Sequence, residues 1–263
     1  MNRLWSLLFL SVPVMAVVIV SGAAGWWGDF ENAWLPPSIG PRTGPIDALF
    51  DHLHMILGVV LVITGLTLPW ALWRYSEKSP GPASPRRGLV WLELVWTAIP
   101  AGILIWLALA QLPLWNRNKV DRPIEYTVET SGERVPRPPL ARVVARQFEW
   151  VFVYPGDDRE FETQDDIISP GLLVVPQDEE VVLQLNSQDV IHSFNVNLLR
   201  LKQDVVPGLT GYVWFTVNRT GTWEINCTEL CGWGHYRMRG ELQALPREEF
   251  ERWQASVFAK MHR

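Results

Sequence analysis

The sequence predicts a membrane protein of two parts, a hairpin of two transmembrane helices followed by an all-β domain. Long apolar runs fall almost entirely within residues 1–115, which contain only twelve charged residues. Residues 116–263 carry 22 acidic and 17 basic side chains, which accounts for the whole net charge of −5. In that second half, short runs of β-forming residues alternate with turn residues. No cluster of basic residues indicates a nucleic-acid partner.

The first apolar run, Leu4 to Val20, follows Arg3 and precedes the small residues Ser21–Ala24. This order of charge, apolar stretch and small residues is typical of a secretory signal peptide. An uncleaved anchor is the alternative, because about 17 apolar residues lie near the lower limit for a membrane span. We therefore expect residues 1–24 to be a signal peptide or an N-terminal anchor.

The two membrane helices are predicted within residues 47–115. Met55 to Trp73 contains 19 residues and no charge, and Leu89 to Trp115 is apolar apart from Glu93, Thr97 and Gln111. The loop between them, residues 74–88, has four basic residues and one acidic residue, so the positive-inside rule places it in the cytoplasm. The domain after Trp115 then lies in the periplasm or outside, whether or not the first segment is cleaved.

Residues 116–263 are expected to form a β-sandwich or barrel, because several short strands are separated by turn signals such as PGDD and NRTG. The prolines at 136, 138 and 139 mark the linker from the membrane. Pro246 to Met261 is predicted to be helical, since a proline begins it and acidic residues follow in its first turn. The candidate strands are Arg142–Tyr154, Leu172–Val175, Glu180–Asn186, Val190–Val196, Gly211–Val217, Thr222–Asn226 and Met238–Ala244.

The two cysteines of the chain, Cys227 and Cys231, share the stretch CTELCGWGHYRM with His235 and Met238. A disulfide is the default interpretation in an oxidising compartment. A zinc site with His192 as a further ligand is the second. Met238 favours a third, because two thiolates, imidazoles and a weak thioether suit copper that cycles through Cu(I).

The pattern Cys-x3-Cys-x3-His-x2-Met, preceded about 35 residues earlier by Asp-Val-Ile-His-Ser-Phe, resembles the binuclear copper A site of the cytochrome c oxidase subunit II family. The stretches DVIHSFNVNLLRLKQDVVPG, GTWEINCTELCGWGH and LELVWTAIP also look like signatures of that family, so the resemblance covers roughly residues 47–260. It implies a cupredoxin-like Greek-key domain, with its C-terminal helix, over residues 116–263.

The resemblance implies two copper ions and six ligands. Cys227 and Cys231 would bridge both ions. His192 and Met238 would complete one ion, and His235 with the backbone carbonyl of Glu229 would complete the other.

The resemblance also gives roles to two carboxylates. The side chain of Glu229 would help to bind a magnesium ion against subunit I, the alternative being a solvated loop carboxylate. Glu93 would admit protons to the lower proton channel, the K-pathway, although a charge at a helix end can simply reach the headgroups.

The resemblance is weaker at the point where electrons arrive from cytochrome c. Many relatives have Gln-Trp there, whereas this chain has Phe148 in place of the tryptophan and Trp150 two residues on, so both are candidates. Nine acidic residues and one basic residue between Asp157 and Glu180 predict a surface that steers a basic donor, or one that only keeps the domain soluble. No Cys-x-x-Cys-His motif indicates a fused c-type haem.

The resemblance predicts subunit II of a haem–copper terminal oxidase in a bacterial cytoplasmic membrane, with subunit I, subunit III and lipid as partners. It would accept electrons from cytochrome c or a similar donor and pass them to haem in subunit I, where oxygen is reduced to water with proton translocation. Two alternatives stay open, the copper A subunit of a nitric oxide reductase and a copper-free structural subunit of a quinol oxidase. The intact ligand set argues against the second, and Glu93 in LELVWT favours oxygen over nitric oxide.

Overall fold

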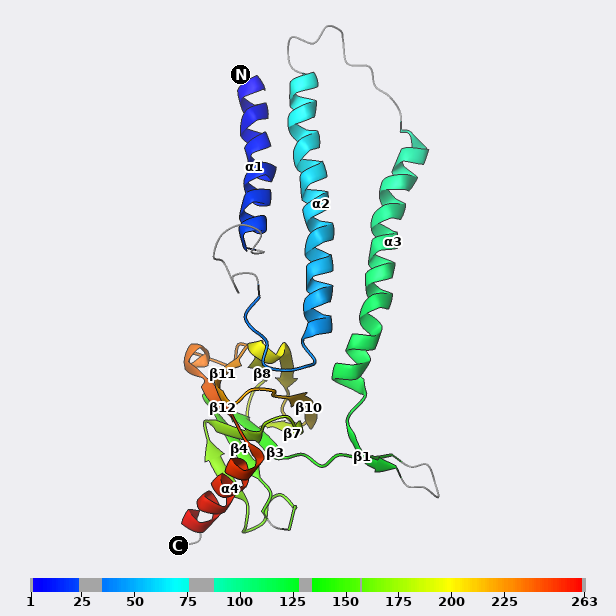
Figure 1. The fold of residues 1–263 in the computed structure, drawn as a ribbon. Coiled ribbons are helices and arrows are strands. Elements are labelled where there is room, and N and C mark those ends of the chain that lie inside the picture. Colours follow the sequence, from blue (N-terminus) through cyan, green and yellow to red (C-terminus); the bar gives the residue numbers. More distant parts are fainter. Residues whose placement is uncertain (1, 24–34, 76–87, 128–133, 157, 262–263) are drawn as a thin grey trace. The chain divides into compact units, whose positions relative to one another are not determined.

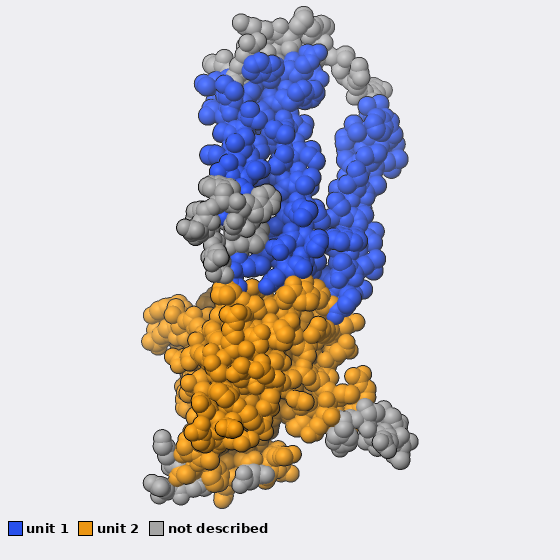
Figure 2. Space-filling model, in the orientation of Figure 1, with its two compact units in different colours: residues 1–36, 47–113 blue, residues 37–46, 114–263 orange. Residues whose placement is uncertain are grey.

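The computed structural model describes residues 2–23, 35–75, 88–127, 134–156 and 158–261. The chain divides into two compact units (Figure 2). One comprises residues 1–36 and 47–113, and the other comprises residues 37–46 and 114–263. The first unit is helical, and the second contains the β-strands.

Three long apolar helices occupy the N-terminal half (Figure 1): α1 Asn2–Ala23, α2 Gly44–Arg74 and α3 Val90–Trp115. Helices α2 and α3 are long and apolar enough to cross a membrane, and their most apolar windows are only 6% and 0% buried. Helix α1 holds a shorter apolar stretch. Ala24 and loop residues 76–87 lie outside the described residues. The cleavage of residues 1–24 and the cytoplasmic location of the loop therefore stay predictions.

Helix α2 begins at Gly44 rather than at the predicted Met55. Its added first turns contain Pro45 and Asp47, which are signals of a helix start. Because these turns also contain charged residues, a search for uncharged apolar runs does not find them. Helix α3 continues at its C-terminal end into the short π-helix η1, Asn116–Val120.

Two five-stranded sheets form the predicted β-sandwich, with strand orders β10-β7-β3-β4-β5 and β6-β12-β11-β8-β9. A separate two-stranded sheet pairs β1 with β2. The bounds are β1 Ile124–Thr127, β2 Arg134–Pro136, β3 Ala141–Arg146, β4 Glu149–Tyr154, β5 Ile167–Pro170, β6 Leu172–Pro176, β7 Glu180–Ser187, β8 His192–Val196, β9 Leu201–Val205, β10 Gly211–Thr216, β11 Gly221–Cys227 and β12 Arg239–Leu245, with the 3-10 turns η2 Asn197–Leu199 and η3 His235–Arg237.

The strand prediction is wrong in two respects. The single strand expected over Arg142–Tyr154 is an antiparallel pair, because Gln147 and Phe148 form a turn between β3 and β4. That run contains no glycine, proline, asparagine or aspartate to signal the turn. Four strands were also missed: β5 and β9 are short, and β1 and β2 lie on either side of residues 128–133, before or within the predicted linker.

The segment 37–46, which ends in the first turn of α2, packs with the β-domain. Ile39 is 2% exposed. Its N–H donates to the Leu198 carbonyl (3.2 Å), and its carbonyl accepts from the Asn218 N–H (2.9 Å). Arg42 forms an ion pair with Glu180 of β7. The β-domain is therefore completed by a segment from much earlier in the chain, since Arg42 lies 138 positions before its partner Glu180.

One end of the sandwich carries the candidate ligands, and the other carries α4 and most of the acidic residues. Strands β3, β7 and β11 end at the ligand end, and β4 and β12 start there. At the opposite end, Tyr154 contacts Trp253 of helix α4, Arg247–Met261, with ring centroids 5.1 Å apart. The acidic residues of 158–166 and 178–180 follow the ends of β4 and β6, so they also lie at this opposite end.

Candidate metal centre

The loop from Cys227 to Met238 joins β11 to β12 and carries five of the six candidate ligands. Cys227 is the last residue of β11, and its N–H donates to the Met238 carbonyl (3.3 Å). Inside the loop, the N–H groups of His235 and Met238 donate to the carbonyls of Gly232 and His235. These bonds close the loop at its base, so the strands fix the spacing of the side chains.

The two thiols face each other without forming a disulfide. Cys227 and Cys231 are both buried, and their Sγ atoms are 3.9 Å apart. A disulfide requires about 2.05 Å. A metal–thiolate bond is about 2.3 Å, so one ion can touch two sulfurs that are separated by up to about 4.6 Å. The pair is therefore placed to share metal ions.

The remaining donors surround this pair. His192 Nδ1 lies 3.9 Å from Cys227 Sγ, and the Glu229 carbonyl oxygen lies 3.3 Å from the same sulfur. On the other thiol, His235 Nδ1 lies 3.6 Å and Met238 Sδ 3.8 Å from Cys231 Sγ. The structure thus brings all six predicted ligand residues together.

The two imidazoles differ in their distances to the thiols and in their exposure. Ligand atoms of His192, Cys227 and Cys231 all lie within 4.8 Å of one another. His235 is outside that group although it contacts Cys231. His192 is fully buried, whereas His235 is partly exposed.

Asp189 orients His192, a role that sequence reasoning missed. One carboxylate oxygen accepts a hydrogen bond from His192 Nε2 (2.8 Å), which leaves the Nδ1 lone pair toward the thiols. The other oxygen accepts the N–H of Gln147 (2.7 Å) in the β3–β4 turn. An acid three residues before a candidate ligand was the available signal. Burial alone would raise the pKa of Asp189, but the hydrogen bonds from His192, Gln147 and Val190 lower it below its usual value.

The Cys231 thiol does not ionise readily without a nearby positive charge. Burial, followed by the neighbouring Cys227, raises the pKa of Cys231 to about 11. Near neutral pH the Cys231 thiol is therefore protonated unless positive charge compensates it, and a bound metal ion supplies that charge. The donor set of two thiols, two imidazoles, a thioether and a carbonyl fits soft metals such as copper.

The two candidate aromatic residues have different surroundings. Trp150 is fully buried and packs edge-on against His192, at 6.1 Å between ring centroids. Phe148 is half-buried in the β3–β4 turn, and its ring contacts Trp233 of the ligand loop at 5.4 Å. Only Phe148 thus lies near the surface.

The two predicted carboxylates lie outside the thiol cluster. The side chain of Glu229 is exposed, and only its carbonyl faces Cys227. Glu93 is exposed in the first turn of α3, and its carboxylate folds toward Gly88, where an added Cβ would lie 2.7 Å from Oε1.

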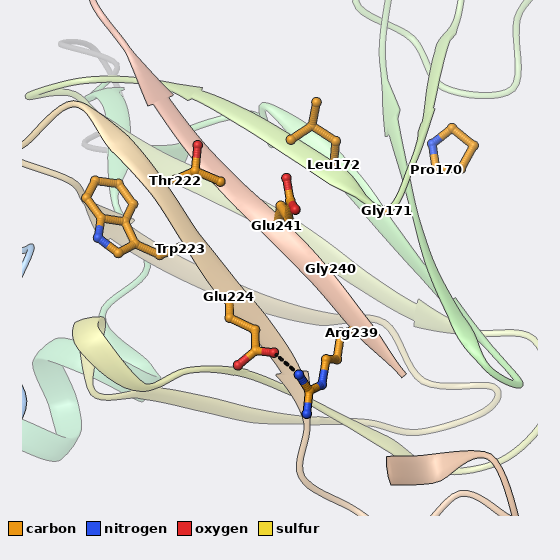
Figure 3. Close-up of a pocket in the computed structure, with 9 residues that line it drawn as sticks. All are labelled: Pro170, Gly171, Leu172, Thr222, Trp223, Glu224, Arg239, Gly240 and Glu241. Atoms are coloured by element: carbon orange, nitrogen blue, oxygen red, sulfur yellow. Dashed lines mark ion pairs between the residues drawn. The ribbon is translucent and has the colours of Figure 1, made fainter. Parts of the chain in front are cut away.

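The β-domain also has a surface groove of about 680 Å³, whose lining residues are drawn in Figure 3. It is formed by β6, β11, β12 and the residues before β6. Two of its lining residues, Glu224 and Arg239, form an ion pair (3.0 Å), and Trp223 lies to one side of that pair. None of the six candidate ligands lines it, so the metal centre and the groove are separate features.

Models of known protein families match both halves of the chain. Residues 26–114 match the family model described as the transmembrane domain of cytochrome c oxidase subunit II. Residues 143–244 match the model described as its periplasmic domain.

Curated relatives match over most of the chain. A probable cytochrome c oxidase subunit 2 of Rickettsia felis is 29% identical over 269 residues, which is 94% of this chain and 79% of the relative. Cytochrome c oxidase subunit 2 of Cereibacter sphaeroides is 27% identical over 248 residues, 82% of this chain and 77% of the relative. Among solved structures, the periplasmic domain of subunit II of cytochrome oxidase of Bradyrhizobium japonicum is 26% identical, with a TM-score of 0.41, and covers 48% of this chain and 98% of that one.

Proposed function

Because the chain belongs to the cytochrome c oxidase subunit II family, we propose that it receives electrons for a haem–copper terminal oxidase at a centre of two copper ions. Its family makes it a subunit of such an oxidase complex, with two membrane helices and an extracytoplasmic C-terminal domain. The donor chemistry of the loop supports the finer assignment.

The observation that carries the proposal is the distribution of donors around the thiol pair. A single ion among His192, Cys227 and Cys231 would leave His235 and the Glu229 carbonyl unused, although both contact a thiol. Two ions that share both thiolates would use every donor. The proposal therefore gives His192 and Met238 to one ion and His235 with the Glu229 carbonyl to the other.

When bound, copper supplies one-electron chemistry between Cu(II) and Cu(I), which sulfur ligands favour. The chain fixes the donors so that they need not move when the charge changes. Cys227 and Met238 are tied at the base of the loop, Asp189 orients His192, and Met238 is 1% exposed, so water is kept from that side. Fixed ligands keep the reorganisation that accompanies electron transfer small.

The wider assignments rest on family membership. The subunit would receive electrons from cytochrome c or a similar soluble donor and deliver them to haem in subunit I of an oxidase in a bacterial cytoplasmic membrane, with subunit III and lipid as further partners. The exposed Glu229 carboxylate would help to hold magnesium against subunit I. Glu93, at the start of α3, would admit protons to the catalytic subunit.

The test is the copper content and the spin distribution of the full chain. We expect two copper ions per chain and one unpaired electron shared by two equivalent nuclei, which gives a seven-line hyperfine pattern. A four-line pattern from one ion would contradict the proposal. Full-chain protein that takes up no copper would support a copper-free structural subunit instead.

Two variants separate the ligand roles in the same measurement. Cys231→Ser should abolish the shared-spin spectrum, because each thiolate would hold both ions. Met238→Leu conserves volume and removes only a weak ligand, so two ions should remain bound with a shifted potential. Loss of copper from Met238→Leu, with the seven-line pattern kept in Cys231→Ser, would overturn these roles.

A further inference from the structure

The ligand loop presents a large aromatic ring, that of Trp233, to solvent midway between Cys231 and His235. Trp233 is 74% exposed and lies two residues from both Cys231 and His235. Trp150, the tryptophan that packs on His192, is fully buried. An exposed tryptophan is unusual, because the burial of its ring is worth several kcal/mol.

Trp233 is held in place by its neighbours. Its ring meets Phe148 edge-on, at 5.4 Å between centroids and 69° between planes. The Arg237 guanidinium lies 4.6 Å from the centroid of the Trp233 ring and 5.9 Å from that of Phe148. The ring is therefore fixed on one side and open on the other.

The glycines on either side of Trp233 pack closely against the Phe148 ring. An added Cβ at Gly234 would lie 2.5 Å from Phe148 Cδ2, and one at Gly232, where φ is +137°, would lie 3.1 Å from Phe148 Cε1. Only glycine fits such contacts. Gln147 Nε2 also donates to the Cys231 carbonyl (2.5 Å). The β3–β4 turn and the ligand loop thus form one rigid platform beneath Trp233.

The chain around this platform carries paired charges. Arg146 and Glu149 flank the β3–β4 turn and form an ion pair (2.6 Å), and Arg239, two residues after Arg237, pairs with Glu224 (3.0 Å). An aromatic centre within a polar, nearly neutral rim is typical of small, transient contacts between redox proteins. The acidic stretches at 158–166 and 178–180 lie at the opposite end of the sandwich and do not form this rim.

We propose that Trp233 is the residue on which the soluble electron donor docks and through which electrons enter the subunit. This inference rests on the proposed function. The donor is a small redox protein whose cofactor edge is exposed, such as a mono-haem cytochrome c. Phe148, one of the two sequence-based candidates for electron entry, packs edge-on against the Trp233 ring.

The electron count is simple. One electron leaves the ferrous haem of the donor, which becomes ferric, and the bound copper centre gains that electron. No bond forms or breaks, and Trp233 is neither oxidised nor reduced. Arg237 disfavours positive charge on the indole, so the ring serves as a tunnelling bridge that is joined to the Cys231 thiolate through Gly232.

The experiment compares Trp233→Leu and Trp233→Phe in the assembled oxidase, with a reduced mono-haem cytochrome c as the probe. Trp233→Leu should lower the second-order rate of copper reduction by roughly 10- to 30-fold, the size of a central aromatic hot spot. Trp233→Phe should fall between Trp233→Leu and the wild type. The hyperfine spectrum and the potential of the copper centre should not change. The copper-free full chain should lose affinity for the oxidised cytochrome by a similar factor.

Tyr236→Leu is the matched control, because Tyr236 is 73% exposed on the same loop and shares no described ring contact with Trp233. Tyr236→Leu should leave the rate of copper reduction unchanged.

An unchanged rate of copper reduction in Trp233→Leu would overturn the inference. So would normal copper reduction with slower transfer from copper to haem, since Trp233 would then face the catalytic subunit. If Trp233→Leu failed to load copper, Trp233→Phe with a normal spectrum and a wild-type rate would also overturn it. A wild-type chain without the seven-line spectrum would instead refute the proposed function.

Discussion

Asp189 joins its own segment of the chain to the β3–β4 turn through a single carboxylate. It accepts hydrogen bonds from His192 Nε2, from the N–H of Gln147 and from the N–H of Val190. Because such partners hold a ligand imidazole in one orientation, their loss typically lowers metal affinity by roughly 10–100-fold. Asp189→Ala should therefore weaken copper binding by this factor, measured by competition with a chelator on the full chain.

Asp189→Asn keeps an acceptor for His192 and should lose less affinity than Asp189→Ala. Glu241→Gln, which removes an exposed carboxylate from the groove, is the matched control and should have no effect. Equal affinities for Asp189→Ala and Glu241→Gln would show that His192 does not need this partner.

The ligands were predictable because five of them lie within one short stretch whose spacing is diagnostic of the family. Asp189 was not singled out, since its partner Gln147 lies 42 residues away and only the fold brings them together. Trp233 was missed for a different reason. Its chemistry depends on exposure and on the Phe148 ring, and neither can be read from residue order.

At the scale of elements, the sequence predicts long, uniform patterns better than short or interrupted ones. The sandwich and α4 follow from alternation and start signals, whereas the β3–β4 turn lacks turn residues and β9 is only LKQDV. The segment at Ile39 was also missed, because it contributes a few residues from before α2 to a β-domain that lies far on in the chain.

Ile39 should stabilise the β-domain measurably. Truncation of a buried isoleucine typically costs about 2–5 kcal/mol, and Ile39 is 2% exposed beside Leu198 and Asn218. Ile39→Ala should lower the free energy of unfolding of the copper-loaded full chain by an amount in this range. The loss of visible copper absorbance with denaturant reports the β-domain alone.

Leu209→Ala is the matched control, since Leu209 is 64% exposed and its truncation should cost little. If the two variants unfolded at the same denaturant concentration, the segment 37–46 would not be part of the cooperative domain.

At the scale of the whole molecule, acidic charge and the metal centre are separated. Strand β4 spans six residues between the ligand end and the acidic stretch at 158–166, roughly 17–20 Å at about 3.3 Å per residue. Fields from exposed charges are screened over about 8 Å at physiological salt. These acids therefore lie too far from the copper centre to steer the donor onto it strongly. If the donor docks on Trp233, the rate of copper reduction should depend only slightly on salt concentration.

Glu93 tests whether proton uptake and electron uptake occur at opposite ends of α3. It lies in the first turn of the helix, and the 22 residues from there to Trp115 span about 33 Å at 1.5 Å per residue. If Glu93 collects protons, Glu93→Gln should slow oxygen consumption by the assembled oxidase about tenfold or more, while stopped-flow reduction of copper by the donor stays unchanged. A purely structural acid at a helix start is worth only about 0.3–1 kcal/mol, so its loss would change assembly slightly or nothing at all. Glu125→Gln, which removes an exposed carboxylate on β1, is the control. Unchanged oxygen uptake in fully assembled Glu93→Gln enzyme would remove Glu93 from the proton pathway.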